Sequence, residues 1–312
     1  MDLLGSYVRE DEARRRRFRR ALAVRLTLWP LLFAVALSLF LRRYESVVTW
    51  HPVHYDGGAR WRLPDGAEDV WFETADGVRL HGWFVRARTA APSATILYAH
   101  GNTGNVSYLG GLAAALAERG FDVLVFDYRG YGRSAGAVTD ERALYADADA
   151  AYDFLTRARG VDPRRLVLYG QSLGTTAVVD VAARRPAGAL VVESGLSSAS
   201  AMAGAVLPWL PRPFHWLSRN RFDSEGKMPR VACPVLFAHG DPDPVVPAAQ
   251  GRALYDAARG PKRLVVLPGA GHNVAGSCGA RYFDAVAAFV RAALDAPQTV
   301  SGAEVNPALC AP

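Results

Sequence analysis

The sequence has little lysine and little cysteine, and its net charge is confined to one end. Lys227 and Lys262 are the only lysines among 36 basic residues, a bias that suggests a GC-rich, bacterial gene. The three cysteines are widely spaced and form no metal-ligand pattern. Residues 1–43 carry ten arginines and four acids, a net charge of +6, so residues 44–312 are neutral overall. The main part of the chain therefore lacks the basic footprint of a nucleic-acid partner, and we expect no metal or organic cofactor.

The amino-terminal segment joins a run of arginines to a long apolar stretch. Residues 26–41 contain no charged side chain, and as a helix they extend ~24 Å, which is less than the ~30 Å hydrocarbon core of a bilayer. Including residues 21–24, with Arg25 reaching the interface, lengthens the helix to ~31 Å. We therefore expect a basic cytoplasmic segment at 1–20 and a transmembrane anchor at 21–41.

A cleaved signal peptide is the alternative explanation of this stretch. Cleavage requires small residues just after the apolar run, but the run ends in Leu-Phe-Leu-Arg-Arg at 39–43. Eight arginines precede the stretch and two follow it closely. Since cytoplasmic flanks carry the excess of arginine, we expect a cytoplasmic amino terminus and a catalytic domain outside the cytoplasm. Residues 42–67 are expected to form a juxtamembrane linker, in which His51 and His54 have no functional role.

The rest of the chain alternates apolar runs with helical patterns. A hairpin turning at Ala75-Asp76-Gly77 is followed by strands predicted at 95–99, 121–126, 165–169, 188–192, 234–238 and 263–267. Helical patterns lie between most of them, at 108–118, 139–158, 173–184, 247–259 and 279–293. This order predicts an α/β domain at 68–293, with a mostly parallel eight-stranded sheet and helices on both faces. Residues 294–312 are expected to be a disordered tail.

The alternation is interrupted once, at 194–230. The middle of this insertion is apolar, aromatic and rich in proline, without a regular period. Because it follows the carboxyl end of a strand, we expect a small lid over the active-site edge. Its expected substrate-binding residues are Trp209, Phe214 and Trp216; the alternative is a surface excursion that packs its own aromatic side chains.

Ser172 is the predicted nucleophile. It stands in Gly170-Gln171-Ser172-Leu173-Gly174, directly between an apolar strand and an apolar helix. Small residues two positions away on each side allow the sharp turn of a nucleophile elbow, and the following helix directs its amides toward the serine. Ser134 lies in a second Gly-x-Ser-x-Gly, at 132–136, but no helix is predicted immediately after it. We therefore expect Ser134 to be a turn residue.

A reactive serine needs a base, and the base needs an acid that orients it. His272, flanked by Gly271 in a loop after the last predicted strand, is the expected base. Asp241 and Asp243 compete for the acid position in the loop after His239, and Glu193 is a remote third candidate. The other histidines are expected to brace loops.

The developing oxyanion also needs hydrogen-bond donors. The backbone amide of Leu173, directly after the nucleophile, is one expected donor. The second is the amide of Asn102, in the glycine-rich loop at 100–105. That loop lacks the Gly-Lys-Ser/Thr ending of a phosphate-binding loop.

Together these motifs resemble those of the α/β-hydrolase superfamily. The resemblance covers about residues 68–293 and points to short-lidded, membrane-anchored members, which include serine aminopeptidase-like and protein-depalmitoylase-like hydrolases. It implies Asp243 as the acid, because in related sequences the acid usually stands four residues after the strand-terminal histidine, here His239. Depalmitoylase-like members work on the cytosolic side, whereas the arginine asymmetry here favours the outside.

The expected function is a serine hydrolase of the carboxylesterase or acyl thioesterase type. It would cleave carboxylic esters or thioesters through an acyl-enzyme intermediate, acting on a small acyl-ester or lipid-like substrate. A serine peptidase is the alternative, since the same triad would serve it. A non-catalytic binding protein on the same fold is a remote alternative, because the serine and the histidine are both present.

Overall fold

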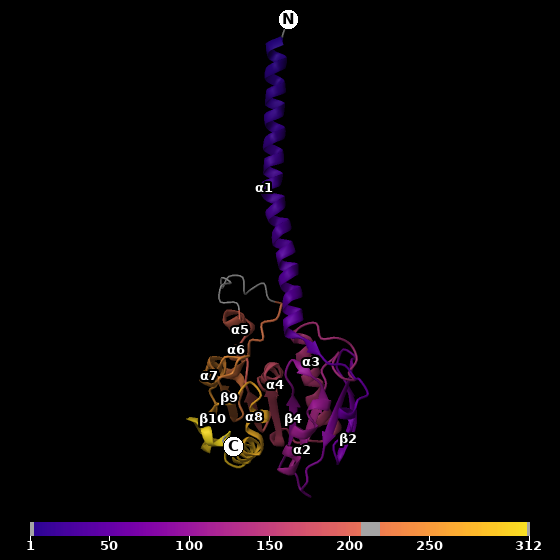
Figure 1. Ribbon diagram of the computed structural model, residues 1–312, viewed down its shortest axis with the longest axis vertical. Helices are drawn as coiled ribbons and strands as arrows, with labels where there is room; N and C mark the ends of the chain where they lie inside the picture. The colour runs from indigo at the N-terminus through magenta and orange to yellow at the C-terminus, as the bar shows by residue number, and fades with distance from the viewer. Residues whose placement is uncertain (1–2, 207–218, 311–312) are drawn as a thin grey trace. The chain divides into compact units, whose positions relative to one another are not determined.

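The structure is a computed structural model that describes residues 3–206 and 219–310 (Figure 1). The chain divides into two compact units, Met1–Val48 and Thr49–Pro312. Nearly all of the first unit is helix α1 (Leu3–Thr49). By length and composition alone, this helix is long and apolar enough to cross a membrane.

The second unit is built on a central sheet. Its strands are β2 (Ala67–Glu73), β3 (Arg79–Val85), β4 (Ala94–Ala99), β6 (Phe121–Phe126), β7 (Leu166–Gln171), β8 (Ala189–Glu193), β9 (Val235–Asp241), β10 (Lys262–Pro268) and β11 (Ser301–Val305). Within the described residues these nine strands follow the spatial order β11-β10-β9-β8-β7-β4-β6-β3-β2. The β2–β3 and β3–β6 pairings are antiparallel, and the others are parallel. This is the mostly parallel sheet that the alternating pattern predicts.

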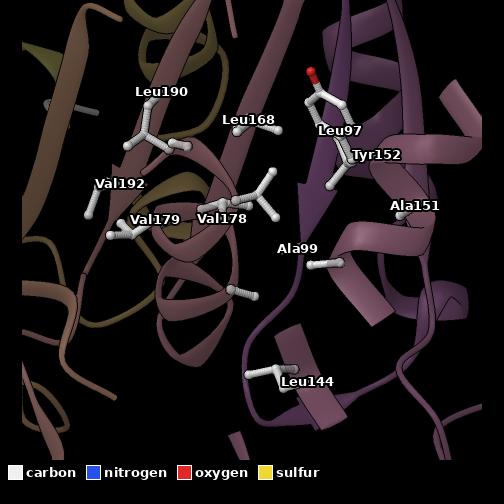
Figure 2. Close-up of a cluster of buried hydrophobic side chains, with 14 of the residues drawn as sticks. Leu97, Ala99, Leu144, Ala151, Tyr152, Leu168, Val178, Val179, Leu190 and Val192 are labelled. Carbon is white, nitrogen blue, oxygen red and sulfur yellow. The ribbon is translucent and has the colours of Figure 1, made fainter. Parts of the chain in front are cut away.

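Helices cover both faces of this sheet. They are α2 (Gly110–Glu118), α3 (Glu141–Asp153), α4 (Leu173–Ala182), α5 (Ala199–Val206), α6 (Ser224–Lys227), α7 (Ala248–Ala257) and α8 (Val274–Asp295), which is kinked at Gly279. Alternate residues of each strand point to opposite faces, so Leu97 and Leu168 join a cluster with Val178 of α4 (Figure 2). Ile96 and Val167 join the opposite cluster, with side chains from α2 and α8. The strand β7, which leads into the serine-bearing turn, is thereby packed on both faces.

The carboxyl-terminal tail differs from the expectation of disorder. Residues 301–305 form β11, which pairs in parallel with β10 and adds a ninth strand to the expected eight. A disulfide between Cys278 and Cys310 ties the tail to α8. The prediction of a disordered tail at 294–312 was therefore wrong for this strand, because its stability comes from a distant strand and a distant cysteine.

The expected linker also contains ordered structure. Strand β1 (His51–Pro52) pairs in parallel with β5 (Thr103–Gly104), in a separate two-stranded sheet. Residues 49–66 thus belong to the second unit rather than to a free spacer. The expected lid residues Trp209, Phe214 and Trp216 lie outside the described residues.

Candidate active site

Ser172 occupies a sharp turn between β7 and α4. Its backbone lies in an unusual conformation, with φ 53° and ψ −122°. A Cβ atom on Gly170 would lie 2.6 Å from the Cα of Thr175, and one on Gly174 would lie 2.1 Å from the carbonyl oxygen of Ala99. Both distances are shorter than any side chain tolerates, so the turn requires glycine at both positions.

Hydrogen bonds hold this strained serine in place. Its N–H donates to the carbonyl oxygen of Glu193 on the adjacent strand, at 2.9 Å. Its own carbonyl oxygen accepts from the N–H and the Oγ1 of Thr175, at 3.0 and 2.6 Å. Thr175, which the sequence analysis did not single out, therefore fixes the first turn of α4 beneath the nucleophile.

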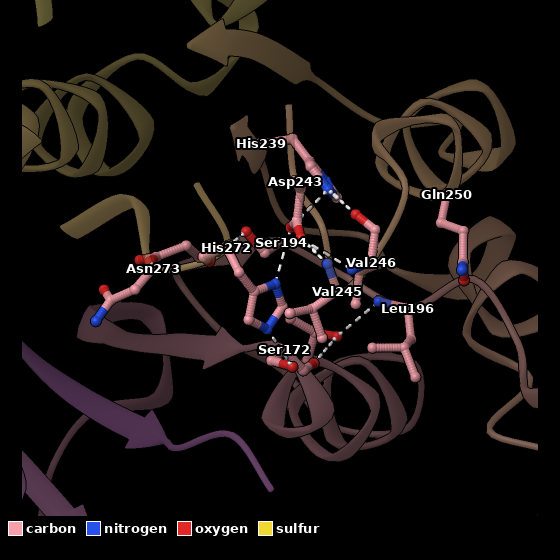
Figure 3. A network of polar contacts seen from close by, with 12 residues as sticks. Ser172, Ser194, Leu196, His239, Asp243, Val245, Val246, Gln250, His272 and Asn273 are labelled. Carbon is pink, nitrogen blue, oxygen red and sulfur yellow. Dashed lines mark hydrogen bonds and ion pairs between the residues drawn. The ribbon is translucent and has the colours of Figure 1, made fainter. Parts of the chain in front are cut away.

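The structure brings His272 and Asp243 to Ser172 (Figure 3). The Nε2 atom of His272 is 2.9 Å from the Oγ of Ser172, and its Nδ1 atom is 2.8 Å from an Oδ of Asp243. A carboxylate only accepts hydrogen bonds, so Nδ1 carries the proton and Nε2 is free to accept one from the serine. The imidazole is one-fifth exposed, whereas the carboxylate is fully buried.

Asp243 is held by four donors. The N–H groups of Val245 and Val246 donate to Oδ1, at 2.8 and 2.9 Å, while Oδ2 faces His272 and the Nε2 of His239, the latter at 3.3 Å. Burial alone would raise the pKa of Asp243, but hydrogen bonds from the two histidines and the two amides lower it well below its ordinary value. The carboxylate therefore stays charged beside the imidazole.

The competing acids have other environments. Asp241 is exposed at the end of β9. The carboxylate of Glu193 is buried and accepts from the hydroxyls of Tyr169 and Tyr282, at 2.5 and 3.1 Å, and from the N–H of Ala275, at 3.2 Å. Burial raises the pKa of Glu193. Of the three candidate acids, Asp243 is the one hydrogen-bonded to His272.

Ser134, in the second copy of the motif, is engaged with the backbone. Its Oγ donates to the carbonyl oxygen of Asp127 at 2.7 Å and accepts from the N–H of His81 at 2.9 Å. These bonds connect the loop after β6 to β3. Ser134 therefore has the environment of a turn residue.

The glycine-rich loop after β4 lies beside the nucleophile. A Cβ on Gly101 would lie 3.4 Å from the Cβ of Ser172. The Nδ1 of His100 is 2.7 Å from the carbonyl oxygen of Gly101, which obliges Nδ1 to be the donor. Burial lowers the pKa of His100, so its ring is neutral. In a trans peptide the N–H points opposite to the C=O, so the amide of Asn102 is directed away from His100.

Two further side chains support the loops that carry the base and the acid. Ser194, with φ 50°, donates from Oγ to the carbonyl oxygen of His272 at 2.8 Å. His239 donates to the carbonyl oxygen of Val246 at 2.9 Å, as expected for a loop-bracing histidine. Only the place of Ser194 directly after a strand could have marked it as a site residue.

Comparisons with known proteins show the family to which the chain belongs. A family described as serine aminopeptidase, S33, matches residues 90–225. The uncharacterized protein Rv2307c of Mycobacterium tuberculosis is 41% identical over 211 residues, which cover 68% of this chain and 74% of that protein. The human alpha/beta hydrolase domain-containing protein 17B is 32% identical over 234 residues, covering 73% of this chain and 78% of that protein. The chain belongs to the α/β-hydrolase superfamily.

Solved α/β-hydrolase structures share the fold at lower identity. The Pyrococcus furiosus esterase Pf2001 superposes with a TM-score of 0.63 at 20% identity, covering 79% of this chain and 98% of the esterase. An esterase domain from Rhodothermus marinus gives a TM-score of 0.57 at 22% identity, covering 73% and 99% of the two chains. At these identities the likeness shows the shared fold.

Proposed function

We propose that this α/β-hydrolase cleaves carboxylic ester or thioester bonds, with Ser172 as nucleophile, His272 as base and Asp243 as orienting acid. One observation carries the proposal. An unbroken pair of hydrogen bonds, 2.9 and 2.8 Å long, runs from the serine hydroxyl through the imidazole to a buried carboxylate. That arrangement removes a proton from the hydroxyl as it attacks.

The proposed reaction has two halves. The Oγ of Ser172 adds to the acyl carbon while its proton passes to the Nε2 of His272. The tetrahedral intermediate expels the alcohol or thiol, which takes that proton, and leaves an acyl-serine ester. Water then gives a proton to the imidazole and attacks the ester, and the imidazolium passes that proton to the Oγ of Ser172 as the acid is released. Asp243 stays ionised throughout and stabilises the imidazolium.

The backbone amides of Leu173 and Asn102 are the proposed oxyanion donors. Leu173 is the first residue of α4, whose amino terminus carries partial positive charge. The Asn102 amide belongs to the peptide that His100 orients. Both amides would stabilise the negative charge that develops on the substrate oxygen only during the reaction. For the acyl chain, we propose contact with Trp209, Phe214 and Trp216 of the insertion.

A serine peptidase is the second candidate, because the matching family is described as a serine aminopeptidase. An aminopeptidase needs a carboxylate that binds the free amino terminus of its substrate. The stretch from 197 to 216 contains no acidic residue, so this candidate ranks below the esterase.

We also propose that residues 21–41 anchor the chain, with the catalytic unit outside the cytoplasm. The arginine asymmetry around the apolar stretch supports this orientation. The Cys278–Cys310 disulfide supports it independently, because disulfides persist in oxidising compartments and are rare in the cytosol.

Two serine variants test the proposed activity. We expect Ser172→Ala to abolish both the hydrolysis of p-nitrophenyl esters of graded acyl length and labelling by a fluorophosphonate probe. Ser134→Ala is the matched control, since it alters the second copy of the same motif. It should keep both activities while losing about 1–2 kcal/mol of stability with its two hydrogen bonds. Labelling that survives in Ser172→Ala would refute the assignment.

A further inference from the structure

The segment that follows α1 lies directly against the loop that carries Asn102. The N–H of His51 donates to the carbonyl oxygen of Asn102 at 3.1 Å, within the pairing of β1 with β5. His51 comes two residues after the last residue of α1, Thr49. The proposed oxyanion loop is therefore contacted from close to the amino-terminal end of the catalytic unit.

The carbonyl group of Asn102 has a second donor. The hydroxyl of Tyr131 donates to the same oxygen at 2.8 Å. Tyr131 is buried in an aromatic group with His100 and Tyr128. Two donors from distant parts of the chain thus fix the peptide that follows Asn102, while His100 fixes the peptide that precedes it.

The segment is itself bound on both sides. The carbonyl oxygen of Val53 accepts from the Nδ2 of Asn105 and from the N–H of Gly132, both at 2.9 Å. The N–H of Tyr55 donates to the carbonyl oxygen of Gly132 at 2.9 Å. These bonds bridge the Asn102 loop and the loop after β6, so the segment behaves as part of the catalytic unit.

A buried aromatic residue anchors the start of the segment. Trp50 is 8% exposed, and its ring meets the edge of Phe222, with centroids 6.0 Å apart and planes at 71°. Phe222 lies in the described carboxyl-terminal part of the insertion, residues 219–230. Burial of an aromatic side chain of this size helps to hold the segment against the catalytic unit.

We propose that residues 50–55 are a positioning element of the oxyanion hole. They hold the carbonyl group of Asn102, so that both peptides flanking its amide are fixed before substrate arrives. The inference rests on the proposed function, because it concerns the donor that would stabilise the oxyanion. No residue of this segment contacts the reacting atoms in the proposal; its effect passes through Asn102.

Two variants of His51 in the full-length chain isolate the hydrogen bond. His51→Pro removes the main-chain N–H, whereas His51→Ala removes the side chain and keeps the N–H. Loss of a whole oxyanion donor lowers kcat by ~10²–10³-fold, so loosening one should cost about tenfold. We expect kcat for p-nitrophenyl butyrate to be about tenfold lower in His51→Pro than in His51→Ala, at similar KM. The Ki of a trifluoromethyl ketone of the same chain length should rise by the same factor, because its adduct places an oxyanion in the hole.

Asn105→Asp is a second variant that leaves the backbone of the segment unchanged. It removes the Nδ2 donor to Val53 but keeps the Oδ1 acceptor that caps Ser107. We expect a several-fold fall in kcat and a matching rise in Ki relative to the wild type, with KM unchanged. If kcat and Ki are unchanged in Asn105→Asp, and are equal in the two His51 variants, the inference is overturned. An unlabelled and inactive wild-type chain would instead overturn the proposed function.

Discussion

At the scale of single residues, the carboxylate of Asp243 makes contacts of two kinds. Its Oδ1 receives two backbone amides, which fix the loop, and its Oδ2 faces two imidazoles. The same carboxylate therefore contributes to the stability of the loop and to the orientation of His272. These two effects can be separated by pH.

Asp243→Asn is expected to lower kcat by about 10³–10⁴-fold, since an amide can favour the wrong imidazole tautomer. The folded-state pKa of Asp243 lies below the ~3.9 of an unfolded aspartate. The stabilising contribution of the carboxylate is therefore fully present above about pH 4 and is lost as the pH falls toward the folded pKa. Urea unfolding should show wild type more stable than Asp243→Asn at pH 7 and 5, with the difference narrowing below pH 4. A difference that grows on acidification would contradict this account.

Ser172 and His272 could be predicted from the residues, because each follows a strand and has glycine close by. The residues alone left Asp241 and Asp243 both open as the acid, and the resemblance favoured Asp243. Ser194 and His51 could not be predicted as site residues. Ser194 acts through a bond from its side chain to a backbone oxygen 78 residues away, and His51 acts through its main-chain N–H. A backbone donor is present at every residue except proline, so no sequence pattern distinguishes one that holds a catalytic loop.

At the scale of elements, the strands and helices that could be predicted are those whose sequences have a strong local periodicity. Among the described strands that were not predicted, β11 is the longest. Its sequence, Ser-Gly-Ala-Glu-Val, has little β propensity, and all five residues are exposed. Five register pairs with β10 and the Cys278–Cys310 bridge supply what local sequence does not. Contacts of this kind join positions far apart in the sequence, so a local sequence pattern does not predict them.

The disulfide gives a prediction at the same scale. The protein should be isolated from its host cells with its free thiols blocked under denaturing conditions at lysis. One thiol should then be blocked, and reduction should release two more. The single thiol is Cys233, which is buried, and burial raises its pKa to about 12, so it should not react before unfolding. Mass spectrometry of alkylated peptides would identify all three positions. Detection of three blocked thiols before reduction would contradict the Cys278–Cys310 pairing.

At the scale of the whole molecule, the charge and the apolar stretch predict an orientation. A carboxyl-terminal alkaline phosphatase fusion should be active in cells, because the phosphatase folds outside the cytoplasm. A green fluorescent protein fusion at the same position should be dark. Replacing four of the arginines between positions 14 and 20 with glutamine should weaken this preference, since arginine on the cytoplasmic flank sets it. A bright fluorescent fusion and an inactive phosphatase would reverse the topology.

The position of β11 at the edge of the sheet affects the tendency of the protein to self-associate. β10 has an apolar centre, Leu264 to Leu267, and without β11 its unpaired backbone groups would form an open sheet edge. Such an edge is a template for strand pairing between molecules. β11 is short and exposed, and it carries Gly302 and Glu304, so it makes a poorer template than the strand it covers. Loss of the tail, or of the covalent bond that retains it, would leave catalysis untouched at first and would appear instead as self-association that rises with concentration.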